Sequence, residues 1–369
     1  MTYLDANATE PLRPQARAAV IDAMDVLGNP SSIHQSGRAA RRLLETARET
    51  IAARFAVAPA DLVFTSGGTE ANALAIHALA IHALAIHALP PGRRLIIGAT
   101  EHDAIRAAAP HATILPVNRD GQADLATLEC LLAEGPALVC LMLANYETGT
   151  LHPIESAAAL CRAHGAWLHV DAVQAAGRIP LDFTALGAHS LALSSHKLGG
   201  PTGAGALLLA PHTHLQPLIA GGGQERGRRG GTPPLPAIAG FAAAAAASHP
   251  AAHHAAWRDS LQAIAESCGA IAIAAAAPRL PNTLCLALPG IRADRQVMAL
   301  DLAGIQVSAG AACSSGKVAR SHVLDAMGLG PLAAEAIRVS LPWNATAADV
   351  AAFATAYRAM AERLARHAA

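Results

Sequence analysis

The sequence predicts an α/β fold with a mostly parallel sheet covered by helices on both faces. Apolar stretches with strand character alternate with helical or loop segments along the chain, an order typical of such a sheet. The clearest stretches are RRLIIGAT, ALVCLMLAN, AWLHVDAV, HSLALSS and GAGALLLA. At 369 residues, the chain is too long for one small core and too short for three ordinary domains. We therefore expect one large domain with a smaller companion.

Composition narrows the classes of partner. The chain has 27 basic and 27 acidic residues, so no broad field would draw in nucleic acid or an anionic membrane, and we expect neither as a partner. The N-terminal MTYLDANATEPLRP has acidic residues and prolines where a signal peptide needs a basic start and an apolar core, which predicts a cytoplasmic location. The cysteines lie far apart without a CxxC motif, which argues against a zinc cluster and a disulfide framework. The six cysteines are Cys130, Cys140, Cys161, Cys268, Cys285 and Cys313. We expect most of them to be buried, unreactive thiols.

The first chemical signal is DLVFTSGGTEAN, residues 61–72, which reads as strand, tight loop and helix start. Its two glycines let the backbone approach a ligand, and a helix N-terminus presents free N–H groups to an anion. A phosphate would fit beside Gly68 and Thr69. Many strand-to-helix turns carry Gly-Gly and bind nothing, so this stretch alone leaves both interpretations open.

The next segment, residues 73–90, repeats one pentapeptide and places histidines at 77, 82 and 87. Residues five apart on a helix point about 140° from one another, so His77, His82 and His87 would not converge on a metal ion. The imidazoles also interrupt the ~20 apolar residues that a membrane span needs. We interpret the repeat as a helix largely buried in the large domain.

Polar residues follow several predicted strands at the point where each strand ends. In a parallel sheet, the carboxyl ends of the strands are where ligands bind. These residues are Glu101 and His102, Asn145 to Thr148, Asp171 and Gln174, and the run from Ser194 to Lys197.

Lysine usage narrows the chemistry further. The chain contains only Lys197 and Lys317, and all its other basic residues apart from histidine are arginine. Arginine cannot lose its proton near neutral pH or condense with an aldehyde, whereas a desolvated lysine can do both. Lys197 follows a strand and precedes a glycine-rich turn, and a solvated surface lysine is the alternative.

A phosphate cradle, a lysine and an aspartate at strand ends together suit pyridoxal phosphate. Lys197 would hold the aldehyde, and Asp171 would pair with the pyridine nitrogen and keep it protonated. The phosphate would rest on Gly68 and Thr69, and His102 would lie across the ring. Taken singly, Asp171 could be a loop residue and His102 a structural histidine.

The ordered motifs identify a family. The chain resembles the cysteine desulfurases of the NifS and IscS type, within the class V aminotransferase group of pyridoxal-phosphate enzymes. The resemblance runs nearly end to end through YLDANATEPL, GNPSSIHQSGR, FTSGGTEAN, TEH, ANYETGT, HVDAVQAAG, SSHKLGGPTG, GGGQERGRRGGT, SAGAACSSGKV, SHVLDAMGL and IRVSLPWN.

This resemblance implies a homodimer of fold type I, with a mostly parallel seven-stranded sheet in the large domain. We assign residues 13–250 to that domain. Residues 1–12 and 251–369 form the small domain, which carries a cysteine loop at about 308–320.

The resemblance also assigns the site. Lys197 bonds covalently to the cofactor, Asp171 and Gln174 hold its ring, and His102 stacks on it. Its phosphate is bound by Gly68, Thr69, Ser194 and His196, with Thr232 reaching the phosphate of the partner subunit. Arg338 clamps the substrate carboxylate with Asn29 nearby, since a guanidinium grips a carboxylate through two parallel hydrogen bonds.

Cys313 lies in SAGAACSSGK, a run of small residues that suits an exposed, mobile loop. By resemblance, its thiolate takes sulfur from L-cysteine as a persulfide, leaving L-alanine, and it could serve as a transient iron-sulfur ligand; we expect no other metal site. The sulfur acceptor would be an iron-sulfur scaffold or a carrier for RNA thiolation. From the residues alone, a free thiol in a disordered loop is the alternative.

One position departs from the family pattern. The family usually has two consecutive asparagines in ANYETG, and the second is here Tyr146, which is larger and cannot mimic an amide. The alternatives are therefore another class V enzyme, an aminotransferase or a selenocysteine lyase, and a non-catalytic binding protein.

Overall fold

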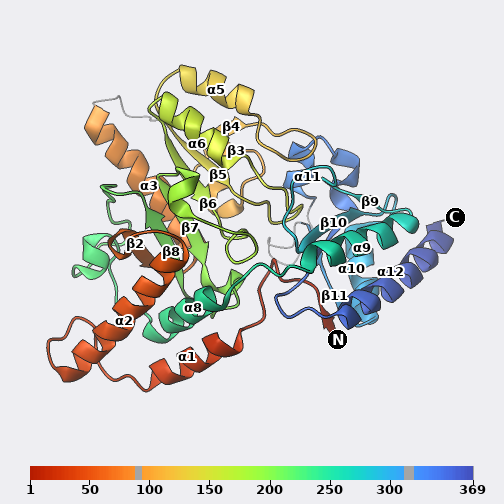
Figure 1. Cartoon of the computed structure of the whole chain (residues 1–369). Coiled ribbons are helices and arrows are strands. Elements are labelled where there is room, and N and C mark those ends of the chain that lie inside the picture. Colours follow the sequence, from red (N-terminus) through yellow and green to blue (C-terminus); the bar gives the residue numbers. More distant parts are fainter. Residues whose placement is uncertain (88–93, 311–319, 369) are drawn as a thin grey trace.

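The computed structural model describes residues 1–87, 94–310 and 320–368 of the chain (Figure 1). Its largest element is a seven-stranded sheet with the strand order β2-β8-β7-β6-β5-β3-β4. The strands are β2 (Leu62–Thr65), β3 (Arg94–Gly98), β4 (Thr113–Leu115), β5 (Ala137–Met142), β6 (Trp167–Asp171), β7 (Ser190–Ser194) and β8 (Gly205–Leu209). Neighbours from β4 to β7 pair in parallel, whereas β8 runs antiparallel to both β7 and β2. The predicted mostly parallel α/β fold is confirmed.

Helices cover both faces of this sheet, which explains why its central strands β5, β6 and β7 are buried along almost their whole length. On one face, the core includes side chains of α1, α2, α5, α6, α7 and α8; on the other, it includes those of α3 and α4. These helices are α1 (Pro14–Met24), α2 (Gln35–Arg54), α3 (Gly68–His87), α4 (Asp103–Arg106), α5 (Leu125–Ala133), α6 (Ile154–Ala163), α7 (Phe183–Leu186) and α8 (Leu235–Ala247).

A second core lies at the right of Figure 1, where both termini are found. Its helices are α9 (His254–Ser267), α10 (Ala293–Leu302) and α12 (Ala347–Ala368), whereas α11 (His322–Ala326) packs in a separate cluster with Met142 and Tyr146. A four-stranded sheet contains β9 (Ile271–Ala272), β10 (Thr283–Ala287), β12 (Ser308–Ala309) and β13 (Ala336–Ser340), and a two-stranded sheet pairs β1 (Thr2–Tyr3) with β11 (Ile305–Gln306).

Short 3₁₀ turns are η1 (Pro59–Asp61), η2 (Ser195–Lys197), η3 (Gln224–Gly227) and η4 (Gly330–Ala334). The predicted boundaries between the large and the small domain, at residues 12/13 and 250/251, stay a prediction.

The N-terminal segment joins the two cores. Leu4 packs among residues of α9, α10 and α12, and Asp5 bridges to Ser340 of β13. The chain then continues to Arg13, whose Nε donates to the carbonyl of Leu198 beside the large sheet. This path brings residues 5–10 between the two sheets.

The alanine-histidine repeat forms a helix, as predicted. Within α3, Ala71, Leu74, Ala75 and Ile76 are buried against the sheet, and His77 is exposed. The side chains of His82 and His87 lie outside the described residues. Over the part of the chain that the structure describes, no three His, Cys, Asp or Glu side chains are grouped so that they could hold a metal ion.

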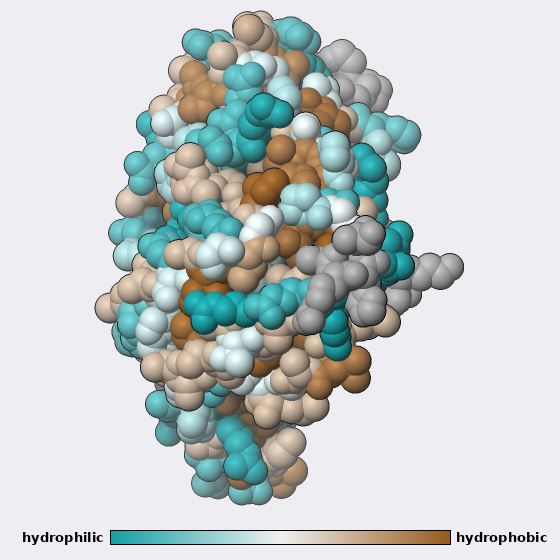
Figure 2. Space-filling model, turned by 90° about the vertical axis from the view of Figure 1, so that its right-hand side faces the viewer, coloured by the Kyte–Doolittle hydropathy of each residue, from teal (hydrophilic) through white to brown (hydrophobic). Residues whose placement is uncertain are grey.

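Figure 2 shows the end of the molecule built from the C-terminal elements as a mosaic of hydrophilic and hydrophobic residues. None of the helices within the described ranges is long and apolar enough to cross a bilayer.

Candidate active site

The strand ends surround a pocket of about 480 Å³, a volume suited to a cofactor-sized ligand. The pocket lies where β5, β6 and β7 end and α3 begins. It brings together eight residues that the sequence analysis placed in a site: Gly68, Thr69, His102, Asp171, Gln174, Ser194, His196 and Lys197.

The N-terminus of α3 forms one wall of the pocket. A β-carbon added at Gly68 would lie 2.7 Å from Cγ2 of Val173 and 3.4 Å from Cβ of Ser194, so only glycine lets the helix start this close to the strand ends. Glu70 accepts a hydrogen bond from the Ser66 N–H at 2.8 Å and pairs with Arg229 at 2.7 Å. The first turn of α3 is thus held in place, and its free N–H groups suit a phosphate.

Lys197 enters the pocket from η2, directly after β7. Its Nζ donates hydrogen bonds to the carbonyl oxygens of Asn7 at 2.6 Å and Ala8 at 2.8 Å. Gln174 donates to the same Asn7 oxygen at 2.9 Å. The amine is therefore directed by the N-terminal segment, which the sequence analysis did not connect with the site.

Asp171 is held by a chain of hydrogen bonds under the pocket. Its Oδ2 accepts from Asn72 Nδ2 at 2.7 Å, while Oδ1 accepts from the Val173 N–H at 2.9 Å. Asn72 Oδ1 lies 2.9 Å from His169 Nε2, and His169 Nδ1 lies 2.8 Å from Ser190 Oγ. Burial lowers the pKa of His169 to about 3, so the imidazole is neutral and orients Asn72 without adding charge.

Sequence reasoning missed Asn72, His169 and Ser190 as part of this site. The sequence could have predicted the place of His169, because residues two apart on a strand point to the same face and His169 stands two positions before Asp171.

His102 caps α4, since its Nδ1 accepts a hydrogen bond from the Ala104 N–H at 3.1 Å. Its ring packs edge-on against Tyr146, with ring centroids 5.3 Å apart. Tyr146 is buried and lines the pocket, so the residue that departs from the family pattern helps to fix the His102 ring. Its carbonyl oxygen also accepts hydrogen bonds from the side chains of Asn7 and Arg338.

His196 lies beside the lysine and lines the same pocket. Its Nδ1 is 3.2 Å from Thr9 Oγ1. Burial, together with the neighbouring Lys197 and Arg178 charges, lowers the pKa of His196 to about 4. A neutral imidazole at this place can donate one hydrogen bond to a phosphate oxygen.

Three described residues that were predicted to belong to the site, Arg338, Asn29 and Thr232, do not line this pocket. Arg338 is 2 % exposed and pairs with Asp5 at 2.7 Å. Asn29 and Thr232 are exposed in loops, and Asn29 Oδ1 accepts a hydrogen bond from the Ser31 N–H. Cys313 lies outside the described residues. The five described cysteines form no disulfide; Cys140, Cys161 and Cys285 are buried, and burial raises the pKa of each thiol.

Glu147 adds a titratable group behind Tyr146. It is completely buried and accepts a hydrogen bond from Ser321 Oγ at 2.6 Å. Burial raises its pKa from 4.5 to about 7, although Ser321, Arg338 and Tyr146 oppose this shift. Because the folded-state pKa is raised, the stabilisation is complete below about pH 4.5 and is lost as the pH rises to about 7.

We therefore expect Glu147→Gln to flatten the fall of thermal stability between pH 5 and pH 8. At pH 8, removing the ionisable group should recover up to roughly 3 kcal/mol of unfolding free energy, the equivalent of the raised pKa. Thermal unfolding measured across this pH range tests the effect, with Glu134→Gln as a control because that side chain is 63 % exposed. Parallel curves for wild type and Glu147→Gln would contradict the expectation.

The pocket residues fit pyridoxal phosphate. They provide a directed amine, a carboxylate held by an amide, and a helix start at which a β-carbon has no room. Each matches one part of that cofactor: its aldehyde, its ring nitrogen and its phosphate.

Comparisons with known proteins agree with this fit. The family model described as "Aminotransferase class-V" matches residues 2–353. A cysteine desulfurase of Cereibacter sphaeroides is 41 % identical over 363 residues, covering 94 % of this chain and 92 % of its own. The structure of a NifS-like protein from Rickettsia africae has a TM-score of 0.87 at 34 % identity, covering 98 % and 99 % of the two chains. That of SspA in complex with cysteine has a TM-score of 0.82 at 29 % identity, covering 93 % and 99 %.

The fold and the site thus define a pyridoxal-phosphate enzyme, and the chain belongs to the class V aminotransferase family. Within that family it groups with the cysteine desulfurases of the NifS and IscS type.

Proposed function

We propose that the enzyme converts L-cysteine to L-alanine and transfers the sulfur to Cys313 as a persulfide. The observation that carries this proposal is that one pocket holds the Lys197 amine, the Asp171 carboxylate and the start of α3. When bound, pyridoxal phosphate supplies an electrophilic aldehyde and a ring that stores the electrons of a broken bond.

We assign each pocket residue to one part of the cofactor or to one step of the reaction. Lys197 holds the cofactor covalently and, once released, removes the α-proton of the substrate. Asp171 would keep the ring nitrogen protonated, Gln174 would help to hold the ring, and His102 would stack on the ring and carry protons. The phosphate is held by Gly68, Thr69, Ser194 and His196, together with Thr232 of a second copy in a homodimer.

Arg338 is proposed to bind the substrate carboxylate, with Asn29 nearby. In the structure, its Nη2 donates to Asp5 and its Nη1 to the Tyr146 carbonyl. A substrate carboxylate that binds Arg338 through two parallel hydrogen bonds would compete with Asp5 for this guanidinium. Its neighbour Tyr146 presents a carbonyl at this point, which fixes the guanidinium plane.

Sulfur transfer is assigned to Cys313. Its thiolate attacks the substrate sulfur, the carbon–sulfur bond breaks, and a sulfur–sulfur bond forms. The electron pair of the broken bond stays with the carbon skeleton, which takes up a proton and leaves as alanine. The persulfide sulfur is then delivered to an iron-sulfur scaffold or to a carrier for RNA thiolation.

Mass mapping of the Cys313 peptide after exposure to L-cysteine tests the proposal. We expect one added sulfur on this peptide in the wild type and none in Cys313→Ser, with alanine formed in step with the label. Cys268→Ser is the matched control, since that thiol is part-exposed and outside the pocket. If Cys313→Ser releases sulfide as fast as wild type, an aminotransferase or selenocysteine lyase assignment replaces this one. If the wild type forms neither alanine nor persulfide, the chain is a binding protein.

A further inference from the structure

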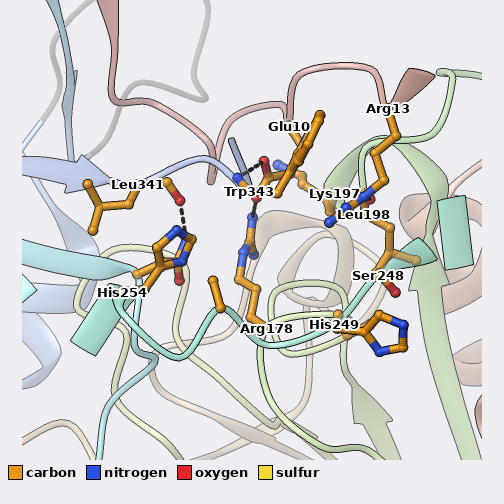
Figure 3. A pocket seen from close by; sticks show the side chains of 14 residues that line it. Glu10, Arg13, Arg178, Lys197, Leu198, Ser248, His249, His254, Leu341 and Trp343 are labelled. Carbon is orange, nitrogen blue, oxygen red and sulfur yellow. Dashed lines mark hydrogen bonds and ion pairs between the residues drawn. The ribbon is translucent and has the colours of Figure 1, made fainter. Parts of the chain in front are cut away.

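A second, much smaller cavity lies on the other side of Lys197 (Figure 3). Its volume is about 20 Å³, enough for a single water and far too small for a substrate. Lys197 lines both cavities. The charged side chains around the small one are Glu10, Arg13, Arg178 and Lys197, joined by His254 and Trp343.

Glu10 and Arg178 form an ion pair within this cluster. Glu10 Oε1 lies 3.4 Å from Arg178 Nη2, and the two side chains are only 5 % and 6 % exposed. An unpaired charge at this depth is costly, so each partner depends on the other. Burial lowers the pKa of His254 to about 4, with His253 adding to the effect, so His254 is neutral. Burial raises the pKa of Glu10 and lowers that of Arg178, and each partner's charge opposes the shift of the other.

Arg178 connects this pair to the cofactor pocket. Its Nη1 donates to the backbone oxygen of Gln174 at 2.8 Å and also to the Gln174 side-chain oxygen. Its Nη2 donates to the Ala6 carbonyl at 3.2 Å. Gln174 in turn donates to the Asn7 carbonyl that Lys197 also uses. One guanidinium thus fixes both Gln174 and the segment that directs Lys197.

Glu10 connects the same pair to the C-terminal core. Its Oε2 accepts a hydrogen bond from the Trp343 N–H at 3.2 Å, as Figure 3 shows, and its own N–H donates to the His196 carbonyl at 3.0 Å. Trp343 Nε1 also donates to the Pro11 carbonyl at 2.8 Å. Glu10 is therefore held, through its carboxylate and its backbone N–H, by segments that precede, flank and follow the lysine in sequence.

We propose that Glu10 and Arg178 are a positioning pair for Lys197: the pair holds the Asn7–Ala8 carbonyls and Gln174 in place and balances charge beside the lysine nitrogen. Neither residue touches the cofactor pocket. This inference rests on the proposed covalent role of Lys197. The alternative is an ion pair that stabilises the fold and does nothing to the lysine.

The visible absorbance of the holoenzyme separates these possibilities, because it reports protonation of the Lys197 nitrogen when that nitrogen is joined to the cofactor. Glu10→Gln leaves Arg178 uncompensated, so the absorbance titration should move down by about one pH unit. Arg178→Met removes a cation, so the midpoint should move up. The double variant restores the balance and should titrate near the wild type. Arg178→Lys keeps the positive charge but loses the two hydrogen bonds that the guanidinium donates to Gln174. The midpoint of the absorbance titration should therefore stay at the wild-type value, while the cofactor dissociates several-fold faster.

The matched control is Glu225→Gln, which breaks another buried ion pair, to Arg48 at 2.8 Å, away from both cavities. It should lower thermal stability and leave the titration unchanged. Midpoints that stay at the wild-type value in both Glu10→Gln and Arg178→Met would overturn the positioning pair. A wild type that forms no chromophore on Lys197 would instead overturn the proposed function. If Arg178→Met does not fold, Glu10→Gln and Arg178→Lys still test the pair: the titration midpoint should move down in Glu10→Gln and hold in Arg178→Lys, while cofactor dissociation should be several-fold faster in Arg178→Lys. A wild-type midpoint in Glu10→Gln together with a wild-type dissociation rate in Arg178→Lys would then overturn the proposal.

Discussion

Replacing Lys197 with alanine should abolish the covalent attachment of pyridoxal phosphate and reduce alanine formation by about 10⁴-fold or more. The side chain is assigned two tasks, holding the aldehyde and removing a proton, and loss of a positioned general base alone costs about 10²–10⁴-fold. The fold should survive, because Lys197 is only half-buried, the Asn7 carbonyl still accepts a hydrogen bond from Gln174, and Ala8 lines the pocket, where water can reach it.

Borohydride reduction of the holoenzyme followed by peptide mapping gives a direct readout. Because the chain has two lysines, Lys317→Arg is a natural control that leaves Lys197 as the sole amine on a lysine side chain. We expect the label on the Lys197 peptide in the wild type and in Lys317→Arg. A label on the Lys317 peptide would refute the assignment of Lys197.

Replacing Asp171 with asparagine should lower kcat for alanine formation by about 10³-fold, comparable to losing a buried electrostatic contact in a transition state. Asparagine preserves the shape but removes the negative charge that keeps the ring nitrogen protonated. The amide must also replace a carboxylate that accepts hydrogen bonds from both Asn72 and Val173.

Steady-state kinetics and the absorbance of the bound cofactor should both change in Asp171→Asn, whereas cofactor content should fall little. Asn72→Ala should give a smaller loss of about tenfold, since it loosens Asp171 without removing its charge. Asp182→Asn is the control: Asp182 is an exposed N-cap of α7 and lies outside the pocket. A kcat for Asp171→Asn within threefold of wild type would exclude the proposed role.

Sequence reasoning located much of the pocket because it depends on one local rule. His102, Asp171 and Lys197 each follow a predicted strand, and parallel strands deliver such residues to one edge of the sheet. The direction of β8 could not be predicted in this way, because an apolar run reads the same for a parallel and an antiparallel central strand. The short strand β4 was missed for a related reason: three residues show no periodicity.

The contacts that hold Lys197 in position could not be predicted from the sequence, for a different reason. Glu10 meets Arg178 across 168 positions and Trp343 across 333. No propensity or spacing rule connects such distant residues, and a glutamate in a loop most often faces solvent. The burial of Arg338 beside Asp5 could not be predicted for the same reason, because these two residues are also far apart in the sequence.

The route of residues 5–10 also bears on how the protein matures. Asp5 and Glu10 precede their partners Arg338 and Trp343 by 333 positions, so these contacts can form only after the intervening chain has been synthesised. Contacts so far apart in sequence form late, because closing a long loop costs entropy before any contact repays it. A nascent chain can therefore complete its large sheet before the surroundings of its reactive amine are formed, which places loading with vitamin B6 after the synthesis of residues 338–343.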